Sequence, residues 1–142
     1  MCYVLRCSLL LAMELKKFGF RQHSLHLDCM YYVLDNIILN GKSYIAGDYI
    51  YCNNISDIDM DKLVFIPYYA EVYDWFDTEK DISIAVWRSN ENYTFAIYDL
   101  SKEINEGNTT LSVICDDDSI TNPIEINEIA ITAAMDYVNR KA

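Results

Sequence analysis

The acidic segment Asp57-Ile58-Asp59-Met60-Asp61 has the residue types and spacing that come closest to a ligand site. Carboxylates at alternating positions open the calcium-binding loop of an EF-hand. That loop also requires glycine at its sixth position and a bidentate glutamate at its twelfth, and this chain has Lys62 and Tyr68 there. We therefore expect a solvated acidic loop in front of an apolar strand, and no calcium site.

Two further groups of residues have side chains that ligate metals. Asp116-Asp117-Asp118 offers several carboxylates, but three successive residues rarely direct their side chains to one ion, and a solvated turn is the simpler interpretation. His23, His26 and Cys29 recur every three residues, yet a structural zinc site needs a fourth ligand, and no second pair stands elsewhere in the sequence. We predict no metal and no cofactor.

The chain has no recognisable catalytic motif. It contains no G-x-S-x-G elbow, no Walker loop and no G-x-G-x-x-G, and its 4 glycines leave little scope for a phosphate-binding loop. Carboxylate pairs are so numerous that no single pair stands out as a general acid and base. We predict no catalytic residues, and a small ligand-dependent or metal-dependent enzyme is kept only as an alternative without a motif to support it.

Aromatic residues interleaved with acids are the unusual feature of this sequence, which holds 12 Tyr, 2 Trp and 5 Phe. Tyrosine and tryptophan provide large, stiff contact areas with a polar tip, which suits protein interfaces. The alternative is that these rings pack in the core. The predicted partner-binding residues are Tyr49, Tyr51, Asp57, Asp59, Asp61, Tyr69, Glu71, Tyr73, Asp74, Trp75 and Asp77.

The charge is strongly negative and unevenly distributed. The chain has 22 acidic and 11 basic residues, a formal net charge of -11, yet residues 1–47 hold only three acids against five bases. The remaining residues therefore carry all of the excess negative charge. Such a field repels nucleic acids and anionic membranes and attracts basic partners. We expect a basic protein as the partner, with no direct nucleic-acid binding and no membrane contact.

The length and composition predict a single domain over residues 1–142. A chain of 142 residues that is 52% hydrophobic can bury a core of its own. Residues 1–12 are treated as a disordered or wrongly assigned extension, because translation from Met13 would give an ordinary soluble N-terminus. The 5 cysteines are odd in number and scattered, which indicates a reducing, cytoplasmic setting. No apolar run approaches the ~20 residues that cross a bilayer.

The first half of the chain allows two interpretations. Apolar residues between Ser24 and Gly41 suit one face of a helix, which we favour, but Asn40-Gly41 between apolar runs also indicates a hairpin. Residues 42–52 are expected to form a strand. Residues 63–66 are expected to form a strand too, with a helix starting near Pro67.

The second half is easier to assign. Alternating apolar residues on both sides of the polar segment 88–92 predict an antiparallel hairpin over residues 82–98, and residues 109–115 predict a further strand. Asn122, Pro123 and Glu125 form a helix start, so a C-terminal helix is predicted over residues 123–140. The expected fold is α+β: a mainly antiparallel sheet of about four strands with two to three helices on one face.

These features favour a non-enzymatic acidic binding protein. In composition the chain resembles the small acidic cytosolic immunity proteins of bacterial toxin systems, so the leading hypothesis is an immunity protein or antitoxin that occludes the active site of a basic nuclease toxin. The alternative is a phage-type DNA mimic or other anti-defence protein. Rows of acids along helices would favour mimicry. Acids on loops around aromatic residues would favour the immunity hypothesis, and that description fits the sequence better.

Overall fold

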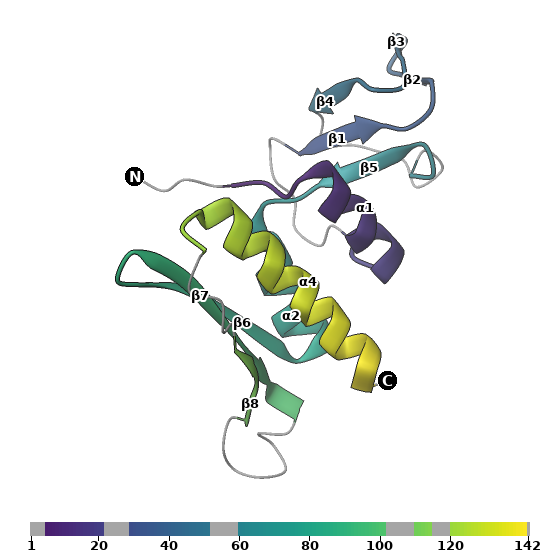
Figure 1. Ribbon diagram of the computed structural model, residues 1–142. Coiled ribbons are helices and arrows are strands. Elements are labelled where there is room, and N and C mark those ends of the chain that lie inside the picture. Colours follow the sequence, from purple (N-terminus) through teal and green to yellow (C-terminus); the bar gives the residue numbers. More distant parts are fainter. Residues whose placement is uncertain (1–4, 22–28, 52–59, 102–109, 115–119, 142) are drawn as a thin grey trace. The chain divides into compact units, whose positions relative to one another are not determined.

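The computed structural model describes residues 5–21, 29–51, 60–101 and 120–141, and the backbone of residues 110–114 (Figure 1). The chain divides into two compact units. The N-terminal unit is Arg6–Tyr68, and the C-terminal unit is Tyr69–Ala142 together with Met1–Leu5. Among the described residues, three helices and eight strands in antiparallel sheets confirm the predicted α+β class.

The N-terminal unit begins with helix α1, Leu9–Phe18. The Ser8 hydroxyl accepts a hydrogen bond from the Leu11 amide at 3.1 Å, which satisfies one of the amides left unpaired at a helix start. Gly19 ends the helix with φ 108°, a conformation that favours glycine. The helix passes through Met13, and Leu11 and Ala12 in front of it are buried, so residues 9–12 of the expected extension belong to the folded unit. Residues 1–4 lie outside the described part of the chain.

A three-stranded sheet of order β4-β1-β5 packs against this helix. Its strands are β1 (Met30–Val33), β4 (Tyr49–Tyr51) and β5 (Leu63–Ile66), and β1 is antiparallel to both neighbours. Ala12 of α1 contacts Val64 and Ile66 on one face of the sheet. Leu63–Ile66 is the strand that the sequence predicts, and all four of its residues are buried.

The predicted helix between Ser24 and Gly41 is wrong. Residues 22–28, Ser24 included, lie outside the described part of the chain, but β1 and the hairpin of β2 (Ile37–Leu39) and β3 (Lys42–Tyr44) occupy the rest of the segment. Asn40 and Gly41 connect β2 to β3 with φ 51° and 80°. Positive φ at both residues suits the two-residue hairpin turn for which Asn-Gly is preferred, so the alternative interpretation holds.

The predicted strand over residues 42–52 is divided. β3 and β4 are separate strands of two different sheets, and a turn over residues 45–48 lies between them. Gly47 has φ 100° in this turn, and the Asp48 amide donates to the Ile45 carbonyl at 3.1 Å. The alternating side chains of this stretch did not reveal the turn.

The C-terminal unit contains helix α2 (Tyr69–Lys80), strands β6 (Ile82–Ser89), β7 (Asn92–Asp99) and β8 (Thr110–Ile114), and helix α4 (Pro123–Lys141). The hairpin, the further strand and the C-terminal helix are confirmed, and the helix expected near Pro67 begins at Tyr69. The sheet has the order β6-β7-β8. Helices α2 and α4 contact each other and pack against β6, and α4 also contacts β7 (Figure 1).

The expected single sheet of about four strands is replaced by three smaller antiparallel sheets. Each compact unit builds its own core. In the C-terminal unit, Phe76 of α2, Ile97 of β7 and Ile131 of α4 are all 0% exposed. Since each helix can bury only one apolar stripe, α2 and α4 need this sheet to cover that stripe.

Candidate functional site

Two of the predicted binding residues, Tyr49 and Tyr51, lie on β4 in the N-terminal unit. Their side chains are 50% and 67% exposed, whereas Ile50 between them is 5% exposed. This alternation is the period of a strand with one buried face. The Tyr49 ring packs edge-on against the ring of Tyr32 with centroids 5.0 Å apart. β4 is an edge strand, so these two tyrosines form an exposed aromatic pair at a sheet edge.

The predicted acidic residues of the same unit are only partly described. Asp61 is exposed, directly in front of β5. Asp57 and Asp59 lie outside the described residues. Lys16 of α1 donates hydrogen bonds to the carbonyls of Met60 and Leu63 close by, the second at 2.7 Å. Burial lowers the pKa of Lys16, and the negative charge of Asp61 partly offsets that effect.

The remaining predicted residues lie on α2 in the C-terminal unit, where they divide between two helix faces. Tyr69, Glu71 and Trp75 are 4%, 7% and 6% exposed. They lie on the side of α2 that packs into the interior of the unit, so they are not available to contact a partner. Asp74 and Asp77 are exposed on the other side of the helix.

Two tyrosine hydroxyls connect α2 to α4. Tyr69 donates to Oε2 of Glu128 at 2.6 Å, and Tyr73, one helical turn further on, donates to Oδ1 of Asn127. Tyr73 is half-buried. These two predicted binding residues therefore join the two helices. They fix the position of α2, which carries the exposed carboxylates of Asp74 and Asp77.

Exposed carboxylates also line α4. Glu125, Glu128 and Asp136 are spaced by three and eight residues, which places them along one side of the helix. Glu125 and Asp136 are exposed, and Glu128 is half-buried beneath its contact with Tyr69. The C-terminal unit as a whole holds fifteen acidic residues against five basic ones, whereas the N-terminal unit holds seven against six. Ten of the chain's eleven excess negative charges thus belong to the C-terminal unit.

The predicted set of binding residues is therefore shared between two units. Tyr49, Tyr51 and Asp61 belong to the N-terminal unit. The α2 residues belong to the C-terminal unit, and of these only Asp74 and Asp77 are exposed.

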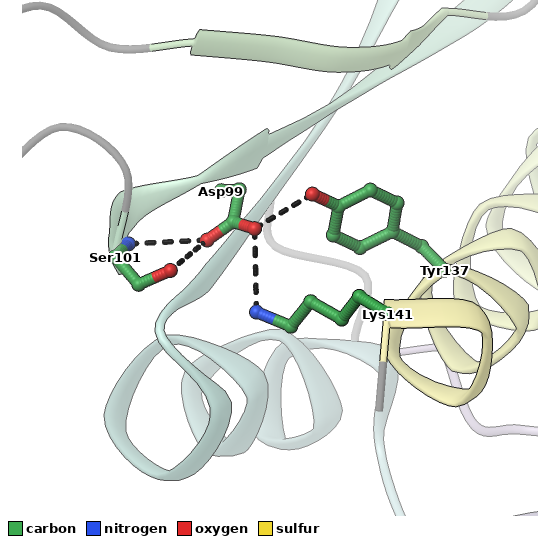
Figure 2. Close-up of polar contacts among 4 residues, drawn as sticks. All are labelled: Asp99, Ser101, Tyr137 and Lys141. Carbon is green, nitrogen blue, oxygen red and sulfur yellow. Dashed lines mark hydrogen bonds and ion pairs between the residues drawn. The ribbon is translucent and has the colours of Figure 1, made fainter. Parts of the chain in front are cut away.

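A buried carboxylate that sequence reasoning missed lies at the end of β7. The side chain of Asp99 is 1% exposed. Its Oδ1 accepts hydrogen bonds from the amide and the hydroxyl of Ser101, at 3.1 and 2.5 Å. Its Oδ2 accepts from the Tyr137 hydroxyl at 2.6 Å and from Nζ of Lys141 at 3.2 Å. Figure 2 shows these donors surrounding the carboxylate, two of them on α4.

The hydrogen bonds decide the ionisation of Asp99. Burial alone would raise its pKa, but the hydrogen bonds from Ser101, Tyr137 and Lys141, together with the Lys141 charge, outweigh burial and lower the pKa from 3.8 to about 2. A carboxylate with that pKa stays ionised at neutral pH, where it accepts all of these hydrogen bonds. The arrangement anchors the last turn of α4 to β7.

The described residues offer no alternative centre for metal chemistry. Within them, no group of three or more His, Cys, Asp or Glu side chains could hold an ion. His23, His26 and Asp116–Asp118 lie outside the described residues, as do Cys2, Cys52 and Cys115. Cys7 and Cys29 are buried free thiols that fill the core as small apolar side chains. No helix in the described part of the chain has the length and apolarity needed to cross a membrane.

Comparisons with protein-family models, curated proteins and solved structures found no match to this chain. The function must therefore be inferred from its own residues.

Proposed function

We propose that this chain is a non-enzymatic acidic protein that binds a basic protein partner through its C-terminal unit. The observation that supports the proposal most is the concentration of charge, fifteen acidic residues against five basic ones within that unit. Two of the basic residues are already engaged, because Lys141 pairs with buried Asp99 and Lys80 lies over the Trp75 ring at 5.4 Å. The unit as a whole keeps an excess of ten negative charges.

The exposed carboxylates of α2 stand on a helix that is held firmly in the unit, which favours a preorganised binding surface. Asp74 and Asp77 stand on a helix whose opposite face is fixed by Trp75 and Phe76 in the core and by the tyrosine contacts to α4. A partner would then meet charges on a rigid element, which reduces the entropy lost on binding. Charged groups arranged in this way accelerate association with an oppositely charged partner.

In its finer form, the proposal is an immunity protein or antitoxin that occludes the cationic active site of a basic nuclease toxin in the bacterial cytoplasm. The carboxylates would take the positions of substrate phosphates. Two free thiols in the core, Cys7 and Cys29, are consistent with a reducing compartment.

One observation favours the alternative, a DNA mimic or other anti-defence protein. Exposed acids lie on the faces of two helices, with Asp74 and Asp77 three residues apart on α2 and Glu125 and Asp136 eleven residues apart on α4. Rows of this kind are what a surface that imitates a line of phosphates requires. The two hypotheses differ in selectivity, because a mimic would displace DNA from unrelated DNA-binding proteins, whereas an immunity protein would bind one toxin.

The test compares two charge reversals of equal size in different units. Asp74→Lys with Asp77→Lys alters the C-terminal unit, and Glu14→Lys with Asp35→Lys, also exposed acids, alters the N-terminal unit. The partner is first recovered by co-purification from the source cell and then purified. Association rates are measured by stopped flow over a range of salt concentrations.

We expect the α2 pair to slow association at low salt and to flatten its dependence on salt, because attraction between unlike charges is screened by ions. The matched pair in the N-terminal unit should have a smaller effect. Equal effects of the two pairs, or no effect of either, would refute a binding surface on the C-terminal unit.

A further inference from the structure

The turn between β2 and β3 places two reactive groups side by side at the surface. Asn40 and Gly41 are both exposed, with φ 51° and 80°. Leu39 pairs with Lys42 across the turn, so the two residues at its tip lie outside the paired strands. An asparagine followed by glycine can react with its own backbone, because glycine has no side chain to hinder the approach of its amide nitrogen.

We propose that Asn40 is a site of spontaneous covalent modification, which needs no enzyme and no cofactor. The Gly41 nitrogen attacks Cγ of Asn40, and the Cγ–Nδ2 bond breaks. Nδ2 leaves as ammonia after taking up the proton of the Gly41 amide, and a five-membered succinimide remains. Water then opens this ring at either carbonyl, which gives aspartate or isoaspartate at position 40.

The Gly41 amide is accessible for this reaction. Within the described part of the chain, the backbone hydrogen bonds outside helices and strands include none from the Gly41 nitrogen. A Cβ placed on Gly41 would meet no atom within 4 Å, so the space beside the turn is open. Among the described residues, neither a competing acceptor nor a neighbouring side chain opposes the attack.

The hairpin that carries the turn is also easy to open. Closing the succinimide ring requires rotation of the Asn40 backbone away from its turn conformation. β2 and β3 form a two-stranded sheet of their own with three residue pairs, and Ile38 in the middle of β2 is 70% exposed. A two-stranded hairpin of this size has little stability by itself, so local opening costs little.

The chain contains its own comparison at Asn90. Asn90 is exposed in the turn between β6 and β7 and has φ 59°, close to the value at Asn40. Its neighbour is Glu91, whose side chain hinders the attack, and β6 and β7 are joined by eight residue pairs. Asn90 should therefore persist under conditions in which Asn40 reacts.

Modification would change the N-terminal unit locally. Both products add one negative charge, to a unit that holds seven acidic and six basic residues. Isoaspartate also lengthens the backbone by one methylene group within a two-residue turn. Because turn length fixes the register of a hairpin, the pairing of Leu39 with Lys42 would be lost.

The experiment uses the purified full chain, incubated at neutral and at mildly alkaline pH and then digested with trypsin. Cleavage after Arg21 and Lys42 releases residues 22–42, which include Asn36 and Asn40. Cleavage after Arg88 and Lys102 releases residues 89–102, which include Asn90. Fragmentation mass spectrometry locates the amide-to-acid mass gain, and an isoaspartyl methyltransferase assay detects the rearranged product.

We expect the mass gain at Asn40 well before Asn90 or Asn36, faster at alkaline pH, with isoaspartate among the products. In Gly41→Ala the conversion should be lost. Alanine is strained at φ 80°, so this substitution destabilises the turn and favours its opening. A loss of conversion in the variant therefore cannot be explained by a more stable hairpin. Equal conversion at Asn40 and Asn90, or conversion that persists in Gly41→Ala, would overturn the proposal.

A second variant separates the effect of glycine from that of the weak hairpin. Glu91→Gly places glycine after Asn90 within the hairpin of eight residue pairs. We expect Asn90 in this variant to react more slowly than Asn40 in the same molecule, and the two rates to converge when the chain is unfolded in urea. Equal rates in the folded protein would refute the role assigned to hairpin opening.

Discussion

The Tyr137 hydroxyl donates a hydrogen bond of 2.6 Å to Oδ2 of Asp99, and so joins the last turns of α4 to the end of β7. Lys141, one turn further along α4, donates to the same oxygen at 3.2 Å. The exposed carboxylates of α4 are useful for recognition only if this helix stays in place. The buried Asp99 is therefore a positioning group for the proposed acidic surface.

Replacement of Asp99 by asparagine should destabilise the protein by about 2 to 3 kcal/mol. The amide group of asparagine presents a donor where Asp99 now accepts, so one of its hydrogen-bonding partners faces another donor in a site that is 1% exposed. The free energy of unfolding is measured by urea titration. Asp136→Asn is the matched control on α4, because Asp136 is exposed, and it should stay close to the unaltered protein. Equal stabilities of the two variants would contradict the role of Asp99.

The ionisation of Asp99 also predicts a dependence of stability on pH. The pKa of Asp99 is lowered from 3.8 to about 2 in the folded chain, so its contribution is complete above about pH 4 and is lost as the pH falls through 2. The stabilisation at stake is about 2 kcal/mol. We expect the difference in unfolding free energy between the unaltered protein and Asp99→Asn to shrink over this range. A difference that stays constant between about pH 6 and pH 2 would exclude the linkage.

The parts of the fold that the sequence predicted correctly are those fixed by neighbours along the chain. The β6–β7 hairpin follows from alternating apolar residues on both sides of one polar turn, and the start of α4 from Asn122 and Pro123. Helix α1 was also readable, since Ser8 caps its start and Gly19 ends it. Both signals were present in the sequence, but the interpretation of residues 1–12 as an extension left this helix unpredicted.

The parts that were predicted wrongly depend on distant partners. Strand β1 is held between β4 and β5, where Tyr31 lies opposite both Ile50 and Phe65. Residues 29–37 in isolation also suit a helical face, so periodicity alone could not choose between the two structures. The Asn40-Gly41 turn was the more specific signal, because few sequences satisfy positive φ at two successive residues.

The Asp99 anchor could not be predicted at all. Asp99 is one of 22 acidic residues, and Tyr137 and Lys141 lie 38 and 42 positions away in the chain. Among the described acids only Glu71 and Asp99 are buried, and the burial of Asp99 depends on how α4 packs on β7. The burial of the aromatic residues depends on tertiary packing in the same way. The sequence alone therefore could not distinguish exposed Tyr51 from buried Tyr69.

The N-cap of α4 gives a further test of the element that carries half of the proposed surface. Oδ1 of Asn122 accepts hydrogen bonds from the amides of Ile124 and Glu125, at 2.7 and 3.3 Å. Asn122→Ala should cost about 1 kcal/mol in unfolding free energy, because alanine leaves these amides without a side-chain acceptor. Thr121→Ala, at the exposed position just before the cap, serves as the control. If both variants lose the same stability in urea titrations, the cap is not responsible.

Arg6 provides the last prediction, in the N-terminal unit. Its guanidinium group donates to the Ile66 carbonyl and to the Tyr68 hydroxyl, both at 2.8 Å, and lies 3.9 Å from the centre of the Tyr68 ring. Arg6→Lys keeps the charge, but an ammonium group cannot stack on the ring and direct two separated donors at once. We expect a loss of about 1 kcal/mol in unfolding free energy, measured by urea titration. Arg21→Lys, at an exposed position, should change stability far less. Equal effects of the two substitutions would show that charge alone, and not the planar guanidinium group, stabilises this part of the chain.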